Sequence, residues 1–308
     1  MNMLDLKITR ATFKRILTLG TALFITACGS KFQAMNLAGV TSSSASNTSP
    51  GGPGHIVPAT MPTAAVGLTE FPNNMNTGVP PGTTLKTTGA ITINTPGTII
   101  DGLDINGSLS ITANNVTIRN SKITVASFAV VRILADLKGV VLEDCTISGV
   151  GVGNDGSLGI QGPGTFLRNN IYNVDIGVSP DSGALIQDNY IHDLRASGVT
   201  SYNGVQIEGG AQNILITHNS IINQNTKTAA VMIDNFFGPV QNIDVENNLL
   251  GGGTYTVYSD GQYTGGAITG VVFTGNHLRP GLNGYHSFKN NAPLFTGNVD
   301  DTTGNLIP

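Results

Sequence analysis

The sequence predicts an all-β protein, a parallel β-helix in which one short repeat builds about eight to nine coils. The repeat is clearest in the stretch NILITHNSI, from Asn213 to Ile221. Its second and fourth residues are apolar, its seventh is Asn and its ninth is aliphatic. Further copies recur at intervals of 18 to 30 residues, which is typical of a solenoid. These copies start at Gly97 (weak), Asn115, Gly139, Gly164, Gly183, Asn242, Gly270 and Ala292 (weak).

The chemistry of the repeat favours stacked strands. From Ala90 onward the sequence shows no helical period, and side chains alternate along a strand. The second and fourth residues of each copy should therefore build an aliphatic column. The seventh residues should form a buried ladder in which amides hydrogen-bond from coil to coil. The predicted ladder members are Ser121, Cys145, Asn170, Asn189, Asn219, Asn248, Asn276 and Asn298.

The third residue of the repeat should face outward, yet it is mostly apolar. A continuous outer apolar stripe needs a cover. We expect the chain's own loops or its N-terminal segment to cover it, and the alternative is a surface for self-association. The stripe consists of Val141, Phe166, Leu185, Leu215, Val272 and Leu294, with Asp244 as the main exception.

Residues 1–27 read as a signal peptide. Four basic residues precede an apolar run of about twelve residues, which is too short to span a bilayer as a helix. The run ends in Ile-Thr-Ala-Cys28, which resembles the bacterial lipobox and so implies lipid attachment to Cys28. The alternative is an ordinary signal peptide. We expect an anchored protein of the bacterial cell envelope, at the outer membrane or cell surface, because Gly29 replaces the Asp that resembles an inner-membrane retention signal.

The rest of the chain divides into a tether and one domain. Residues 28–68 are rich in Ser, Thr, Gly and Pro and should form a disordered tether. Residues 69–308 should form a single β-helix domain, with residues 69–88 as an N-terminal cap. Without residues 1–27 the chain has 11 basic and 18 acidic residues and a net charge of −7, which argues against a nucleic-acid partner.

A second strand precedes each repeat, and its outward residues are chemically varied. If Val205 and Ile207 align with Val231 and Ile233, the carboxylates of Glu208 and Asp234 lie about 5 Å apart. Such a pair either shares a proton or binds a hard cation such as Ca²⁺. The outward row comprises Arg132, Gln161, Gln206, Glu208, Met232, Asp234, Tyr258 and His286.

These residue types suit β-elimination on a uronic-acid polymer, in which a base removes a proton while the neighbouring carboxylate is neutralised. The candidate catalytic residues are Glu208, Asp234, Tyr258 and His286. The candidate substrate-binding residues are Arg132, Gln161, Arg195, Tyr202 and Gln206. The alternative is a solvated surface without catalytic chemistry. His192 could join the site from a loop.

Four stretches resemble the pectate-lyase-like, right-handed parallel β-helix superfamily, and secreted bacterial β-helix proteins within it. They are FPNNMNTGVPPGTTL (71–85), PGTIIDGLDINGSLSITANNVTIRNSKI (96–123), GVQIEGGAQNILITHNSI (204–221) and GPVQNIDVENNLLGGGTYTVY (238–258). The resemblance implies a right-handed coil and a polysaccharide ligand, but no single activity, because the superfamily includes lyases, hydrolases, epimerases and non-catalytic adhesins. The chain departs from the secreted group at Ser201-Tyr202-Asn203, where that group tends to carry His and Asp.

The sequence thus leads to three functional hypotheses for a lipid-anchored β-helix protein. The first is a polysaccharide lyase-like enzyme. The second is a non-catalytic glycan-binding or adhesive module. The third is a structural envelope protein that self-associates through the apolar stripe.

Overall fold

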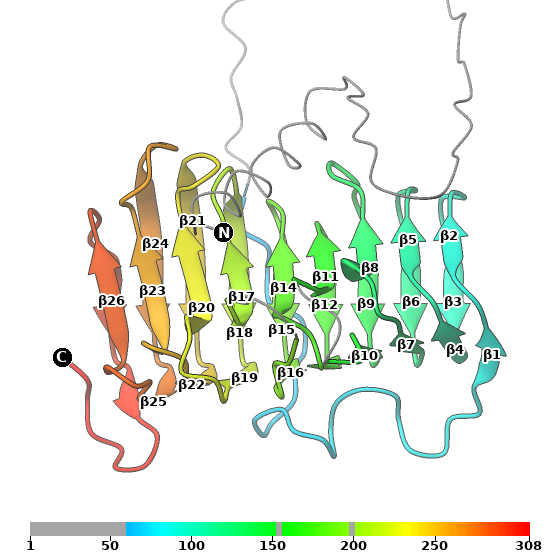
Figure 1. The fold of residues 1–308 in the computed structure, drawn as a ribbon, viewed down its shortest axis with the longest axis horizontal. Coiled ribbons are helices and arrows are strands. Elements are labelled where there is room, and N and C mark those ends of the chain that lie inside the picture. The colour runs from blue at the N-terminus through cyan, green and yellow to red at the C-terminus, as the bar shows by residue number, and fades with distance from the viewer. Residues whose placement is uncertain (1–59, 152–155, 197–200) are drawn as a thin grey trace, which may run out of the picture. The chain divides into compact units, whose positions relative to one another are not determined.

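The structure, a computed structural model, describes residues 60–151, 156–196 and 201–308. The predicted signal peptide, the lipidation site Cys28 and most of the predicted tether lie outside these residues. The described chain forms 28 strands and no helix, and so contains no helix that could span a membrane. Successive strands enter three sheets in turn, and the strands pair in parallel with those three places away in the chain. This is a parallel β-solenoid of about nine coils, which confirms the predicted fold class (Figure 1).

Each sheet contains one strand from each successive coil. Sheet A consists of β1 (Lys86–Thr88), β4 (Leu103–Asn106), β7 (Lys122–Thr124), β10 (Thr146–Ser148), β13 (Asn170–Tyr172), β16 (Tyr190–Ile191), β19 (Ser220–Asn223), β22 (Leu249–Gly252), β25 (His277–Arg279) and β28 (Val299–Asp300). Sheet B consists of β2 (Ile91–Ile93), β5 (Leu109–Ile111), β8 (Ala129–Ile133), β11 (Leu158–Gly162), β14 (Ile176–Pro180), β17 (Asn203–Ile207), β20 (Ala229–Asp234), β23 (Val257–Asp260) and β26 (His286–Lys289). Sheet C consists of β3 (Ile99–Asp101), β6 (Thr117–Arg119), β9 (Val141–Glu143), β12 (Thr165–Leu167), β15 (Leu185–Gln187), β18 (Gln212–Thr217), β21 (Val240–Glu246), β24 (Ile268–Thr274) and β27 (Leu294–Thr296).

The core is a set of aliphatic columns that run through the stacked coils. One inward residue from each strand of sheet A between β4 and β25 lies directly above its counterpart in the next coil. Each of these side chains is at most 1% exposed, and burial of one such side chain stabilises the fold by roughly 1.5–3 kcal/mol. The column contains Ile105, Ile123, Ile147, Ile171, Ile191, Ile221, Leu250 and Leu278.

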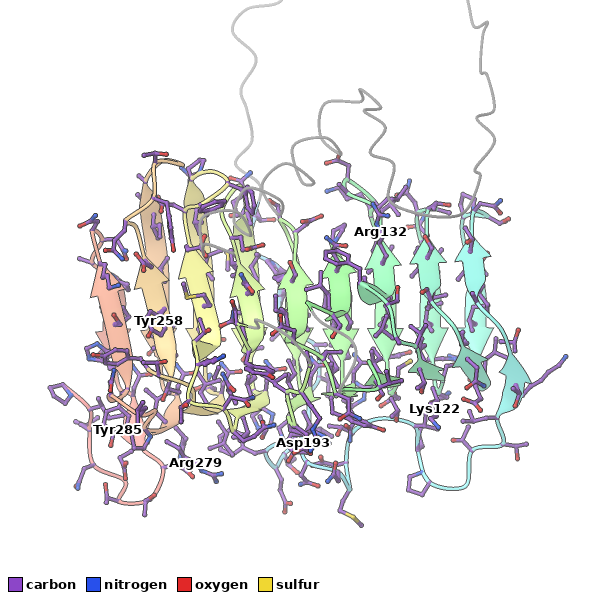
Figure 2. All side chains as sticks on the ribbon, viewed as in Figure 1. Lys122, Arg132, Asp193, Tyr258, Arg279 and Tyr285 are labelled. Carbon is purple, nitrogen blue, oxygen red and sulfur yellow. The ribbon has the colours of Figure 1, made fainter. Side chains whose placement is uncertain are left out.

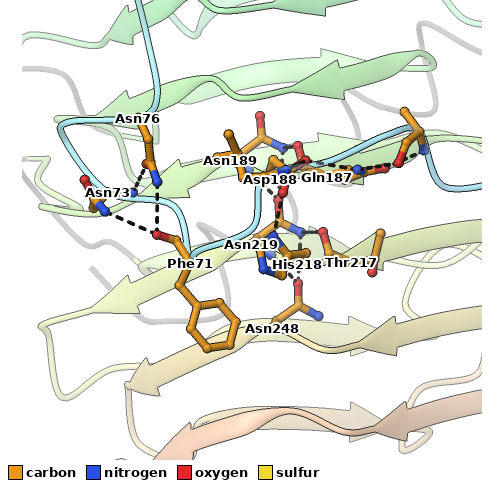
Figure 3. Close-up of polar contacts among 12 residues, drawn as sticks. Phe71, Asn73, Asn76, Gln187, Asp188, Asn189, Thr217, His218, Asn219 and Asn248 are labelled. Atoms are coloured by element: carbon orange, nitrogen blue, oxygen red, sulfur yellow. Dashed lines mark hydrogen bonds and ion pairs between the residues drawn. The ribbon is translucent and has the colours of Figure 1, made fainter.

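The predicted asparagine ladder lies at the bend between sheets C and A. Asn219 donates from Nδ2 to Oδ1 of Asn248 at 2.9 Å and to the carbonyl oxygen of Ile186 at 2.8 Å. In turn its own Oδ1 accepts from Nδ2 of Asn189 at 3.0 Å (Figure 3). The same amide-to-amide bonds continue to Asn298. All side-chain polar groups of these buried amides are therefore used within the protein.

One ladder member differs from the prediction. Asn169 bonds to Oδ1 of Asn189, and Cys145 donates its backbone N–H to Asn169. Asn170, which the repeat alignment placed in the ladder, instead begins β13 and faces outward. The copy that starts near Gly164 is shifted by one residue, so Thr165, and not Phe166, lies in the outer stripe between Val141 and Leu185.

Residues 61–79, which we call the strap, run along the solenoid beside the bend between sheets C and A (Figure 1). Met61 packs on a small apolar cluster of Leu167, Leu185 and Leu215, two of which belong to the outer stripe. The N-terminal segment therefore covers part of that stripe. The strap lies along the side of the solenoid. The sequence instead predicted that these residues form a tether up to residue 68 and then a cap over the first coil.

The last coil is closed by the end of the chain. Leu306 forms an antiparallel bridge with Val299, and the backbone N–H of Ile307 donates to the carbonyl oxygen of Asn298 at 2.9 Å. The Ile307 side chain is 8% exposed and belongs to the main core. The C-terminal residues therefore complete the hydrophobic core at this end of the solenoid.

The ladder should contribute most to stability in its middle. Asn219→Ala removes the acceptor of Asn189 and the donor to Ile186, and buried polar groups without partners cost about 1–3 kcal/mol each. We expect Asn219→Ala to lower the free energy of unfolding by about 3–5 kcal/mol. Asn298→Ala, at the ladder's end, should cost less. Urea denaturation of both variants provides the comparison, and equal small losses would contradict a cooperative ladder.

The thiol of Cys145 should be inert in the folded protein. Burial raises the pKa of Cys145 to about 12, and the thiolate is the reactive species. In a Cys28→Ser variant, we expect iodoacetamide at pH 8 to leave Cys145 unmodified in buffer and to modify it fully in denaturant. Mass spectrometry gives the extent of alkylation. Rapid alkylation of the native protein would show that the site opens readily.

Candidate functional site

Sheet B brings four of the predicted site residues into one outward row. The register pairs Arg132 with Gln161, and Gln161 with Ser179. Further along, Gln206 pairs with Met232, which pairs with Tyr258. Arg132 and Gln161 are half-buried, whereas Gln206 is 6% exposed and accepts a hydrogen bond from Asn203 at 2.9 Å. The row is polar and regular.

The predicted carboxylate pair is part of a longer row. Ile207 pairs with Ile233, so Glu208 follows β17 at the level of Asp234. Asp234 in turn pairs with Asp260, which pairs with Lys289. Sequence reasoning found the first two carboxylates but missed Asp260.

The two aspartates of this row hold the loops beside them. Asp234 is 5% exposed and its Oδ1 accepts the backbone N–H of Phe236 at 2.9 Å. Asp260, equally buried, accepts from the backbone and side chain of Gln262 and lies 3.4 Å from the ammonium of Lys289. The pKa of Tyr263 is raised, first by burial and then by the charges of Asp234, Asp260 and Glu208. These aspartates are therefore engaged by the protein itself.

Three other predicted residues lie outside the row. His286 pairs with Val257, at an inward register, and its ring stacks on Phe288 with centroids 4.6 Å apart. The prediction that His286 faces outward beside Tyr258 does not match this register. Arg195 lies with its aliphatic carbons against Gly151. The hydroxyl of Tyr202 donates to the carbonyl oxygen of Ala196, at the turn before β17.

Among the residues that the structure describes, no three or more His, Cys, Asp or Glu side chains are grouped so that they could hold a metal ion. The predicted calcium site at Glu208 and Asp234 is only a pair of carboxylates, and Asp234 is almost fully buried. Calcium at these residues stays a prediction.

A different outward row, on sheet A, combines aromatic rings with an arginine. We call it the sheet A strip and define it as the row of Tyr172, His192, Ile222, Gly251 and Arg279 together with Tyr190, which lies two residues before His192 in the adjacent row. Ile222 pairs with Gly251, and Gly251 pairs with Arg279. The Tyr190 ring stacks on His192 with centroids 3.9 Å apart, and the Tyr172 ring stacks on the same imidazole at 5.4 Å. Asp193, beside His192, and Arg279 lie along the lower side of the stack in Figure 2, below Arg132 and Tyr258.

His192 is the most buried polar group of the strip. Its Nδ1 lies 2.7 Å from Oδ2 of Asp193, and its Nε2 lies 2.9 Å from Oδ1 of Asn170. Burial lowers the pKa of His192, and Asp193 opposes this effect. Both ring nitrogens of His192 therefore have a side-chain partner, and the imidazole stacks on two tyrosine rings.

A pocket of about 240 Å³ lies at the arginine end of the strip. Gly251 lies between Ile222 and Arg279 in the row, and a Cβ atom there would lie only 3.1 Å from Cβ of Arg279 and 3.5 Å from Cδ1 of Ile222. Arg279 is half-exposed and donates from Nε to Asp301 at 2.7 Å. The pocket is lined by Ile222, Asn223, Gln224, Asn225, Thr226, Gly251, Gly252, Gly253, Arg279, Pro280, Gly281 and Leu282.

No family model, curated protein or solved structure matches the chain. The case for a site therefore depends on the geometry of these two sheet faces.

Sequence reasoning missed the sheet A strip. The signal was present in YIHDLR, where Tyr190 and His192 alternate with the buried Ile191. Arg279 follows 87 residues after His192 and meets the same row only through the coil register. Because the loops between coils differ in length, the sequence alone does not give that register.

The buried imidazole should make stability depend on pH. Because the folded-state pKa of His192 lies below its ordinary value of 6.5, protons bind the unfolded chain better. The stability that depends on a neutral His192 is therefore fully present above about pH 6.5, and it is lost as the pH falls. We expect urea denaturation between pH 8 and 5 to show a smaller loss of stability for His192→Gln than for the wild type. Identical pH profiles would contradict this assignment.

Proposed function

We propose that this protein is an exported, lipid-anchored glycan-binding protein of the bacterial cell envelope. The observation that carries the proposal is the sheet A strip, in which stacked aromatic rings lead to a pocket bordered by Arg279. The predicted signal peptide and lipid attachment at Cys28 support the location in the envelope.

The residue types of the strip suit a sugar polymer. Tyrosine presents an apolar ring with a polar edge, which matches a sugar with apolar C–H faces and polar hydroxyls. Tyr172, Tyr190 and Ile222 are all partly exposed. Ligand sites are commonly apolar surfaces with a few convergent polar groups, and the pocket has amide side chains at its rim.

Arg279 favours an acidic sugar. A guanidinium binds carboxylates through two parallel N–H donors. Asp301 takes the Nε donor of Arg279, and the half-exposed side chain lines the pocket and has further N–H donors to offer a ligand there. A polymer that lies along the strip would cross successive strands about 4.8 Å apart, so one chain could contact several coils.

Lyase-like catalysis on sheet B is the second candidate. The in-register row of Arg132, Gln161 and Tyr258 favours it. The engagement of Asp234 and Asp260 by loops and the inward register of His286 favour binding without turnover.

Calorimetry with uronic-acid and neutral polysaccharides should reveal the ligand class. We expect Arg279→Ala to weaken binding of an acidic glycan at least tenfold, because a charged hydrogen bond contributes about 1.5–3 kcal/mol. Arg119→Ala is the matched control, since Arg119 is similarly exposed and pairs with Asp101 at 2.8 Å. No binding to any glycan of the panel would contradict the proposal.

The same panel tests catalysis. Absorbance of unsaturated products, followed with and without Ca²⁺, reports β-elimination directly. Under the binding proposal the trace stays flat, and Glu208→Ala with Asp234→Ala does not alter glycan affinity. Turnover that this double substitution abolishes would instead establish the lyase.

A further inference from the structure

The strap is joined to the aromatic end of the sheet A strip by a chain of side chains. Asn170 donates from Nδ2 to Oδ1 of Asn74, in the strap, at 3.1 Å. Oδ1 of the same Asn170 amide lies 2.9 Å from Nε2 of His192. Two contacts thus connect the strap to the imidazole on which Tyr172 and Tyr190 stack.

A second connection reaches the arginine end. Phe71 of the strap meets the ring of His277 edge-on, with centroids 5.3 Å apart. His277 lies 3.5 Å from Asp301 through Nδ1, and the same carboxylate accepts from Nε of Arg279 at 2.7 Å. Phe71 therefore contacts His277, which in turn neighbours the carboxylate that holds the pocket arginine.

Separate contacts hold the strap against the solenoid. The backbone of Ala65 exchanges two hydrogen bonds with the Gln187 side chain, at 2.7 and 2.9 Å. The N–H of Leu68 donates to Asp188, which is fully buried and lies 2.6 Å from Nδ1 of His218. Figure 3 shows Gln187, Asp188 and His218 together with Phe71.

The strap's other end is held beside the aromatic rings. The backbone N–H of Gly78 donates to the carbonyl oxygen of Arg168 at 2.8 Å, and that of Val79 donates to Oγ1 of Thr146. A side chain at Gly78 would collide with Thr146 and Asn170, so the close approach there needs glycine. The strap therefore has one defined path between its two connections to the strip.

We infer that the strap positions both ends of the glycan-binding strip, His192 through Asn74 and Arg279 through Phe71, so that strap docking and glycan binding strengthen each other. The inference rests on the proposed function. Its physical basis is reciprocity: if a docked strap raises glycan affinity, the bound glycan must stabilise the docked strap by the same factor. Asn74 and Phe71 are positioning residues, which act through Asn170 and Asp301.

The first experiment measures affinity for the acidic glycan that the wild type binds. Asn74→Leu removes the acceptor of Asn170, and Phe71→Ala removes the ring beside His277. We expect each to weaken binding about fivefold or more, while Asn74→Asp and Phe71→Tyr, which keep the acceptor and the ring, retain wild-type affinity. Arg119→Ala is the control, because Arg119 pairs with Asp101 and belongs to neither the strap nor the strip.

The second experiment needs no glycan. Imidazole nitrogen chemical shifts of His192 and His277, measured by NMR, should change in Asn74→Leu and Phe71→Ala respectively and stay unchanged in Arg119→Ala. Unchanged imidazole shifts in both variants would overturn the inference.

The third experiment tests reciprocity. Saturating glycan should slow hydrogen exchange at the N–H groups of Leu68 and Gly78, which bond across to the solenoid. If the wild type binds glycan but the variants bind equally well and exchange is unchanged, the inference fails and the proposed function stands. If the wild type binds no glycan, the proposed function fails and the imidazole shifts alone decide whether the strap positions the strip.

Discussion

The regular spacing of the coils is the constraint on which the rest of the structure depends. Backbone hydrogen bonds set neighbouring strands about 4.8 Å apart, and the asparagine ladder repeats the same bend in successive coils. Asn189, Asn219 and Asn248 each donate to the next coil and also bind a carbonyl oxygen of an earlier strand. This double bonding leaves the bend little freedom. Outward residues therefore line up in rows, and each row acts as a surface with a fixed chemical pattern.

Much of the fold could be predicted from the sequence. The second and fourth residues of the repeat indicate which face of the strand is buried, and the seventh residue indicates where the chain bends. The single error in the ladder has a local cause. Asn169 and Asn170 are adjacent, and each gives the repeat an apolar fourth residue, Phe166 or Leu167, although only the register with Asn169 also gives an aliphatic ninth residue, Ile171. The pairing of Thr165 with Val141 and Leu185 decides between them, and that pairing is a contact between coils.

The candidate site could be predicted less well. The closeness of Glu208 and Asp234 follows from the strand register alone, so it could be predicted without knowledge of the loop conformations. The loops decide what those carboxylates do, since Phe236 and Gln262 bring their backbone N–H groups to Asp234 and Asp260. The strap's bonds join residues 122 positions apart, such as Ala65 and Gln187, and no short-range pattern in the sequence encodes them.

The place where the strap meets the solenoid also sets how the domain would respond to force. Met61 packs on strands β12, β15 and β18, which are central in sheet C. A pull on the chain at residue 60 would load contacts with several coils at once, in shear. A pull on residue 308 would instead draw Ile307 from the core and peel the final coil. The domain should thus resist a pull at residue 60 better than a pull at its C-terminal end.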